Sequence, residues 1–204
     1  DSVTSIGNCA FYCCSSLTSV TIGNSVTSIG DGAFSRCTGL TSVTIGNSVT
    51  SIGDYAFYYC TGLTEINYNA KAVTDLTINS NVFYNAGTAG SGIKVTFGEK
   101  VKKVPDYLFS TQYSSLFPKI REIVFLGNAP TIGSKSFNGV TASAYYPYGN
   151  GTWTSEVMKG YGGRITWNPY SDAEAVSVVC NGKTSYIVGD ELYTSSISVT
   201  IERS

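Results

Sequence analysis

Residues 26–48 read Val-Thr-Ser-Ile-Gly-Asp-Gly-Ala-Phe-Ser-Arg-Cys-Thr-Gly-Leu-Thr-Ser-Val-Thr-Ile-Gly-Asn-Ser, and almost the same letters begin again at residue 49. The pattern also extends back to residue 3, so the chain repeats with a period of 23 residues. A fixed period between about 20 and 50 residues is typical of solenoids, propellers and arrays, in which successive units stack. Seven columns of small or apolar side chains recur at this period: Val3, Val26 and Val49; Ile6, Ile29 and Ile52; Ala10, Ala33 and Ala56; Phe11, Phe34 and Phe57; Cys14, Cys37 and Cys60; Leu17, Leu40 and Leu63; Val20, Val43 and Ile66.

Each unit can be interpreted as one coil. Residues 17–22 have the spacing Leu-x-x-Val-x-Ile, which is typical of the strand of a leucine-rich repeat, and residues 23–25 supply turn-forming side chains. Residues 26–29 then return to the core as a second short segment. The Ala-Phe-x-x-Cys spacing of residues 33–37 predicts one helical turn. Because a single coil cannot bury its own apolar side, the coils must stack on one another.

The pattern loosens after Leu63 but continues. Residues 94–101 overlay residues 19–26, an insertion occupies 85–92, and a further coil follows in 120–137. We therefore predict an α/β repeat fold, a right-handed leucine-rich-repeat solenoid of about six coils. Each coil is expected to contribute short parallel strands and one helical turn.

The stretch Val-Thr-Ser-Ile-Gly-Asp-x-Ala-Phe-x-x-Cys-x-x-Leu-x-x-Val-x-Ile of residues 26–45 resembles the repeat of the BspA-like leucine-rich repeat family. The resemblance runs from residue 1 to about residue 140, and residues 144–167 resemble the segment that closes such arrays. The first domain is therefore expected to span 1–167. The resemblance implies a secreted or surface-attached protein, bacterial or in some cases protozoan, that is used for adhesion or protein binding. It implies no enzymatic activity.

A second segment, 168–204, begins with a polar joint that contains proline. Alternating side chains predict strands at 176–179 and 197–201, separated by residues 182–190 with a Gly-Asp turn. The Tyr-x-Val-Gly-Asp spacing of this turn resembles the opening strands of bacterial Ig-like modules. Because a complete sandwich needs about seven strands, the tail is either part of such a module or a set of strands packed on the solenoid end.

Composition excludes several classes of function. The chain has no His, so Ser-His-Asp and Cys-His catalysis within it are excluded. Its formal net charge is −1, so no overall field draws it to nucleic acid or to an anionic membrane. No apolar run is long enough to span a bilayer. The chain opens in the middle of a repeat, and we expect it to be a fragment.

The cysteines are expected to be structural. Parallel stacking places column neighbours about 4.8 Å apart, whereas a disulfide needs converging Cβ atoms about 3.8 Å apart. We therefore expect buried free thiols, although a local bridge from Cys9 to Cys13 or Cys14 is left open. A zinc site at these three cysteines lacks the usual spacing and a fourth ligand. The six cysteines are Cys9, Cys13, Cys14, Cys37, Cys60 and Cys180.

A column of Asn8, Asp31 and Asp54 brings two carboxylates to one edge. Their expected distance suits a retaining glycosidase, but identical environments lack the asymmetry that separates an acid from a nucleophile. Asn and Asp are favoured N-caps, so we expect this column to cap the helical turns. The sequence therefore predicts no catalytic residue, no metal ligand and no cofactor.

Three surfaces are candidates for binding a partner. The exposed strand positions form a row of polar side chains, which either binds a ligand or is simply solvated. Residues 94–135 carry a net charge of +4 against −3 for residues 1–70, which favours a partner with an acidic patch or merely marks a solvated face. Aromatic residues crowd the closing segment, where they either stack on sugar rings or cover the open end. The candidate ligand-binding residues are Thr21, Thr44 and Asn67; Lys100, Lys102 and Lys103; and Trp153.

These observations favour a non-enzymatic protein, secreted or at the cell surface, that adheres to a host or other-cell protein of the matrix type. A carbohydrate- or cell-wall-binding module and a structural spacer that presents another domain are the alternatives. We expect a monomer, without nucleic acid as a partner and without membrane insertion by this chain.

Overall fold

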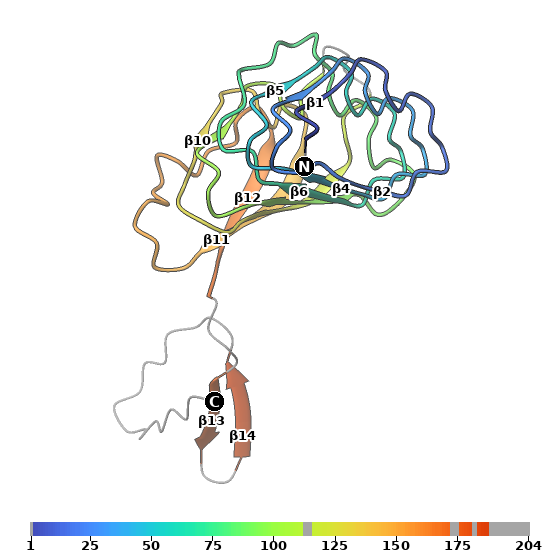
Figure 1. The fold of residues 1–204 in the computed structure, drawn as a ribbon. Helices are drawn as coiled ribbons and strands as arrows, with labels where there is room; N and C mark the ends of the chain where they lie inside the picture. The colour runs from blue at the N-terminus through green and yellow to red at the C-terminus, as the bar shows by residue number, and fades with distance from the viewer. Residues whose placement is uncertain (1, 112–115, 172–175, 181–182, 188–204) are drawn as a thin grey trace.

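The computed structural model describes residues 2–111, 116–171, 176–180 and 183–187. Its main feature is a seven-stranded parallel sheet with the order β12-β11-β9-β7-β6-β4-β2. Figure 1 shows these strands along one side of a stack of coils. The segment that was expected to close the array thus extends the sheet by two strands. The bounds are β2 Ser19–Thr21, β4 Ser42–Ile45, β6 Glu65–Tyr68, β7 Ile93–Phe97, β9 Ile120–Phe125, β11 Thr141–Pro147 and β12 Arg164–Tyr170.

Short strands form the second edge of the stack. β1, β3 and β5 pair in parallel, and so do β8 and β10. An isolated bridge from Ala72 to Lys103 lies between these two small sheets. The bounds are β1 Ser5–Ile6, β3 Ser28–Ile29, β5 Ser51–Ile52, β8 Lys103–Val104 and β10 Thr131–Ile132.

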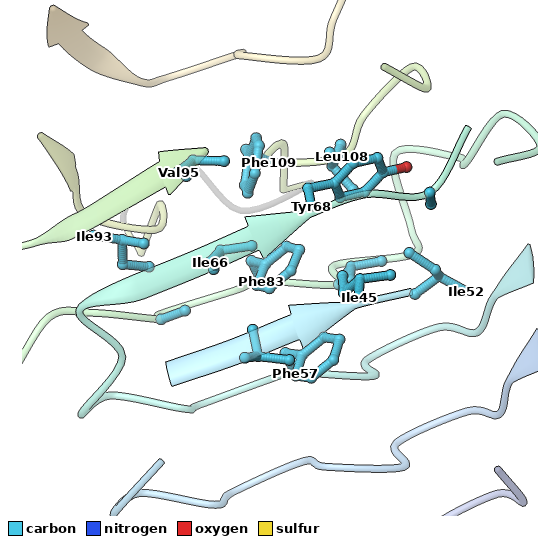
Figure 2. Packing of buried hydrophobic residues seen from close by; sticks show 14 of the residues in the cluster. Ile45, Ile52, Phe57, Ile66, Tyr68, Phe83, Ile93, Val95, Leu108 and Phe109 are labelled. Atoms are coloured by element: carbon cyan, nitrogen blue, oxygen red, sulfur yellow. The ribbon is translucent and has the colours of Figure 1, made fainter. Parts of the chain in front are cut away.

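Successive coils lie in register, as the 23-residue period predicted. Val20 pairs with Val43, and Val43 pairs with Ile66. Six phenylalanine rings stack in one column with neighbouring centroids 5.1–6.1 Å apart: Phe11, Phe34, Phe57, Phe83, Phe109 and Phe137. Figure 2 shows three of these rings, from residues 57, 83 and 109, in successive coils. This column confirms a parallel repeat fold with one continuous core, while the right-handed winding stays a prediction.

The first coil is less buried than the others. Phe34 and Phe57 are fully buried, but Phe11 is 42% exposed because only its inner face contacts another ring. Val3 and Tyr12 in the same coil are also exposed. The strength of a coil's packing therefore depends on neighbours on both sides.

The predicted helical turn in each coil is wrong, since the described residues contain no helix. The amides of Gly32 and Phe34 donate instead to the carbonyls of Asp54 and Ala56 in the next coil, both at 2.8 Å. Gly32 and Arg36 have φ angles of 58° and 61°, in the left-handed region. A right-handed helix cannot continue through residues with left-handed φ angles. Every second backbone amide in this segment therefore points along the stack and donates to the next coil.

The predicted capping role of the Asn8 column is also wrong. The Oδ1 atom of Asn8 accepts a hydrogen bond from the Asp31 amide, and Oδ1 of Asp31 accepts one from the Asp54 amide, both at 2.9 Å. Hydroxyls run along the stack in the same way, because Thr41 and Thr64 each donate to the carbonyl of the threonine one coil before. These side chains connect coils rather than terminate a helix.

The buried cysteines match the expectation of free thiols. Cys37 and Cys60 are fully buried, and their Sγ atoms donate to backbone carbonyls of the preceding coil at 3.0 and 3.1 Å. Burial raises the pKa of both thiols. Cys9, Cys13 and Cys14 are exposed and free, which contradicts the local disulfide that the sequence left open. Burial was wrongly expected for Cys14, because its coil is the first and has no described neighbour on its outer side.

In the tail, β13 (Val176–Cys180) and β14 (Lys183–Ile187) pair as an antiparallel hairpin. The first predicted strand is therefore present, while the strand predicted at 197–201 lies outside the described residues. β12 continues to Tyr170, three residues past the expected boundary at 167. The Ig-like identity of the tail stays a prediction.

Candidate functional site

A groove of about 400 Å³ lies where the chain leaves the main sheet in three successive coils. We call it the basic groove, because three of its lining residues are lysines and one is an acid. Two of the lysines were candidates from the sequence. The lining residues are Lys71, Glu99, Lys100, Val101, Lys102, Asn128, Ala129 and Thr131.

Backbone pairing beyond the main strands brings two of these lysines together. Tyr68 at the end of β6 pairs with Phe97 at the end of β7, but Ala72 then bridges to Lys103, so the second coil has two more residues in this turn. The Lys102 amide donates to the Lys71 carbonyl at 2.8 Å, which places Lys71 beside Lys102 in the adjacent coil. Lys100 lies in the turn between Phe97 and Lys102.

None of the described ion pairs includes a lysine of the basic groove. Lys103 instead contacts Asp75, with Nζ and Oδ2 2.8 Å apart, and it does not line the groove. This hydrogen bond and one from the Asp106 amide lower the pKa of the Asp75 carboxyl below its ordinary value. Lys71, Lys100 and Lys102 are exposed, so their charges face solvent beside a single carboxylate, that of Glu99.

The far wall of the groove is fixed by the coil that follows it. The Ala129 amide donates to Thr152 Oγ1 at 2.9 Å, and Asn150 Nδ2 donates to Asn128 Oδ1 at 2.9 Å. Thr152 also donates its hydroxyl to Asn150 Oδ1. Two side chains of one turn thus hold Asn128 and Ala129 in place.

Trp153 supports this wall from inside the molecule. Its side chain is only 6% exposed, and its Nε1 donates to the Gly127 carbonyl at 3.1 Å. Its ring lies 4.8 Å from that of Phe125 and 5.6 Å from that of Trp167. The ring faces are used in the core, so Trp153 is not the exposed sugar platform that the sequence suggested. It packs at the end of the array, as the alternative interpretation expected.

The outer face of the main sheet carries the row expected from the sequence. Thr21 pairs with Thr44, Thr44 with Asn67, and Asn67 with Thr96. Lys94 and Glu122 face each other in the next row of the sheet, and their opposite charges form an ion pair with Nζ and Oε1 2.8 Å apart. The structure therefore brings Thr21, Thr44 and Asn67 together on one surface, separate from the basic groove.

The sequence analysis missed Lys71 and Glu99 as groove residues. Lys71 lies outside both charged segments, 1–70 and 94–135, and the insertion before β7 lengthens the offset between paired strand residues from 23 to 29. Aligning the coils by Tyr68 and Phe97, the last residue of each strand, would have placed Lys71 in the turn next to the one that holds Lys100 and Lys102.

In the described part of the chain, no three His, Cys, Asp or Glu side chains gather closely enough to hold a metal ion. Nor is any helix there long and apolar enough to cross a membrane.

Comparisons with known proteins identify the family. One solved structure, a leucine-rich repeat protein from Bacteroides ovatus determined at 1.19 Å, is 18% identical, with a TM-score of 0.27. The match covers 81% of this chain and 64% of that one. No curated protein matches the sequence. The BspA type leucine-rich repeat region matches residues 1–116 in six copies. The chain therefore belongs to the BspA-type leucine-rich repeat family.

Proposed function

We propose that this chain is a non-enzymatic binding protein of a cell surface, which adheres to a protein of a host or of another cell through the basic groove. Leucine-rich repeat proteins are generally non-enzymatic, and the family is consistent with a binding or structural role. Proteins of the BspA type are typically surface-associated in bacteria. The fold by itself names no partner, so the proposal rests on the site.

The observation that supports the proposal most is a set of three lysines around one groove, none of which takes part in an ion pair with a described residue. A stacked array offers an extended surface, but most of its positions are small and polar. At the groove, three coils combine to concentrate positive charge over a concave surface whose far wall is held by hydrogen bonds. Complementary charge raises the rate at which a partner associates and fixes its orientation.

The test uses plates coated with a basement-membrane protein extract and compares retention of the wild-type chain with that of variants. We expect the double variant Lys100→Glu plus Lys102→Glu to lose most of its retention at physiological salt. Lys135→Glu, an exposed site outside the groove, makes the same type of charge change and serves as the control. Equal losses in both variants, or none in either, would contradict a role for the groove.

A further variant separates the groove from the outer sheet face. Thr44→Lys places a long side chain in the middle of the row formed by Thr21, Thr44 and Asn67. We expect it to retain full binding. Loss of binding in Thr44→Lys, with none in the lysine variants, would move the site to the sheet face. Retention that is absent from every form, including wild type, would favour the structural-spacer alternative.

A further inference from the structure

The basic groove contains an arrangement that is unfavourable for the chain alone. The Lys102 amide donates to the Lys71 carbonyl, so two lysines of adjacent coils lie side by side. The same backbone hydrogen bond in the early coils joins two neutral residues, Thr50 and Thr27. Lys100 adds a third positive charge to the groove lining, and like charges on neighbouring chain segments are unfavourable.

We propose that the groove binds an acidic segment of a polypeptide, whose carboxylates pair with Lys71, Lys100 and Lys102, and that Glu99 limits the affinity. This inference rests on the proposed function and names the chemistry of the partner. An acidic segment neutralises the stacked lysines, which no acid of the described chain pairs with. Each charge pair at such an exposed site contributes modestly, so several are needed.

The apolar lining favours glutamate-rich polypeptide over a sulfated glycan. Val101 is buried and Ala129 half-buried, and both line the groove together with the three lysines. The two methylene groups of a glutamate side chain can pack on this apolar surface while the carboxylate reaches a lysine. A sugar ring would place hydroxyl groups against the same surface, and polar groups that lose water without a partner are costly.

The size of the groove also limits the partner. A volume of about 400 Å³ is within the range of sites that enclose a few side chains of a ligand. The net charge of the whole chain is −1, so no overall field draws anions to it, and the groove attracts them only through its own lysines. A short acidic stretch of polypeptide fits both limits, whereas a long duplex or a membrane requires a broader basic face.

Glu99 gives the proposal a test of opposite sign. Its exposed carboxylate lines the groove beside the three lysines, so it competes with the carboxylates of a bound segment. Removing this charge strengthens binding, while removing a lysine weakens it. A variant that binds more tightly than wild type cannot do so by failing to fold.

The experiment measures fluorescence anisotropy of a labelled hexa-glutamate peptide with the whole chain at low salt. We expect Lys71→Gln, Lys100→Gln and Lys102→Gln each to weaken binding about two- to five-fold, and Glu99→Gln to strengthen it about two-fold. Lys135→Gln is the matched control and should bind as wild type does. A hexa-glutamine peptide should not bind.

Three results would overturn the inference: hexa-glutamine binding as well as hexa-glutamate, Lys135→Gln losing as much affinity as Lys71→Gln, or Glu99→Gln binding no more tightly than wild type. A heparin hexasaccharide that binds through Lys71 while the acidic peptide does not would also overturn it. That last result would leave the groove as the adhesive site, so it would not by itself contradict the proposed function. Unchanged matrix adhesion in Lys100→Glu plus Lys102→Glu would contradict the proposed function instead.

Discussion

Coils up to Leu63 and coils after it bury equivalent positions with different side chains. At the C-terminal end of each main strand, one buried position is Ile22 and Ile45 in the early coils. In the later coils the same position is occupied by Tyr68, Phe97 and Phe125. The early coils carry almost no positive charge, whereas the later ones carry the lysines of the basic groove. Near-identical repeats therefore supply the stacking, and the departures from the repeat supply the candidate site.

The largest expected effect comes from breaking the ring column in its middle. Phe57→Ala removes a fully buried ring that stacks on Phe34 and Phe83 at 5.2 and 5.1 Å. We expect the free energy of unfolding to fall by about 3–5 kcal/mol, as for other buried phenylalanines replaced by alanine. Urea denaturation followed by circular dichroism measures this change.

Phe11→Ala is the matched control, because the same residue type occupies the same column at the first coil. Its ring is 42% exposed and has one stacking neighbour, so it has less buried area to lose. We expect less than half of the Phe57→Ala effect. Equal losses at both positions would mean that stacking is uniform along the array, against the comparison of buried and terminal coils.

The column of rings was predictable because it depends only on the period and on the apolar character of each position. The path between the buried residues was not. Residues 33–37 have helical spacing, yet the amide of Phe34 finds its acceptor at Ala56 in the next coil. A pattern within one coil does not reveal a hydrogen bond to another coil, so a helical turn and an inter-coil turn look alike in the sequence.

The candidate site was predicted in part for the same reason. Lys100 and Lys102 stood out by their charge, but Lys103 has the same charge and is paired with Asp75. Trp153 is of a residue type that often binds ligands, but Phe125 and Trp167 pack around its ring and bury it. Residue type gives the chemistry that is available, while exposure and partners depend on the fold.

Asp31→Ala tests the side-chain ladder of the early coils. Its Oδ1 accepts the Asp54 amide at 2.9 Å, so alanine leaves that amide without its partner. Because this hydrogen bond is exposed and water can replace the acceptor, we expect a loss of about 0.5–1.5 kcal/mol in the free energy of unfolding, measured by urea denaturation. Asp31→Asn should restore stability, because Asn8 performs the same role one coil earlier. If Asp31→Asn is as unstable as Asp31→Ala, the charge matters and the ladder does not.

Tyr68→Phe tests the position where the early column changes to aromatic residues. The Tyr68 hydroxyl is buried and has no hydrogen-bond partner among the described residues, and desolvation by burial raises its pKa. Its registered neighbour one coil later is Phe97, which lacks a hydroxyl. A buried hydroxyl without a partner is unfavourable, so we expect the variant to be more stable by about 1 kcal/mol in thermal and urea denaturation. A less stable variant would show that the hydroxyl has a partner.

The smallest expected effect separates the later ladder from the early one. Asp75 Oδ1 accepts the Asp106 amide, as Asp31 does for Asp54, but its other oxygen pairs with Lys103. The pKa of Asp75 is lowered, so this stabilisation is present above the ordinary value of 3.8 and is lost as the pH falls through the lower, folded-state value. Asp75→Asn keeps an oxygen for the amide and removes only the charge. Because the pair is exposed, we expect the variant to be about 0.2–0.5 kcal/mol less stable at pH 7.

The difference between wild type and Asp75→Asn should shrink as the pH falls from 4 towards 2, because the wild-type carboxyl then becomes neutral as well. It should also shrink at about 1 M salt, where screening reaches roughly 3 Å. Asp31→Asn, which has no lysine beside it in the described ion pairs, should show neither dependence. A difference at Asp75 that persists at pH 2 and in high salt would assign its role to the hydrogen bond with Asp106 alone. The later coils would then be joined at this position by the same side-chain hydrogen bond as the early coils, with no contribution from the charge of Lys103.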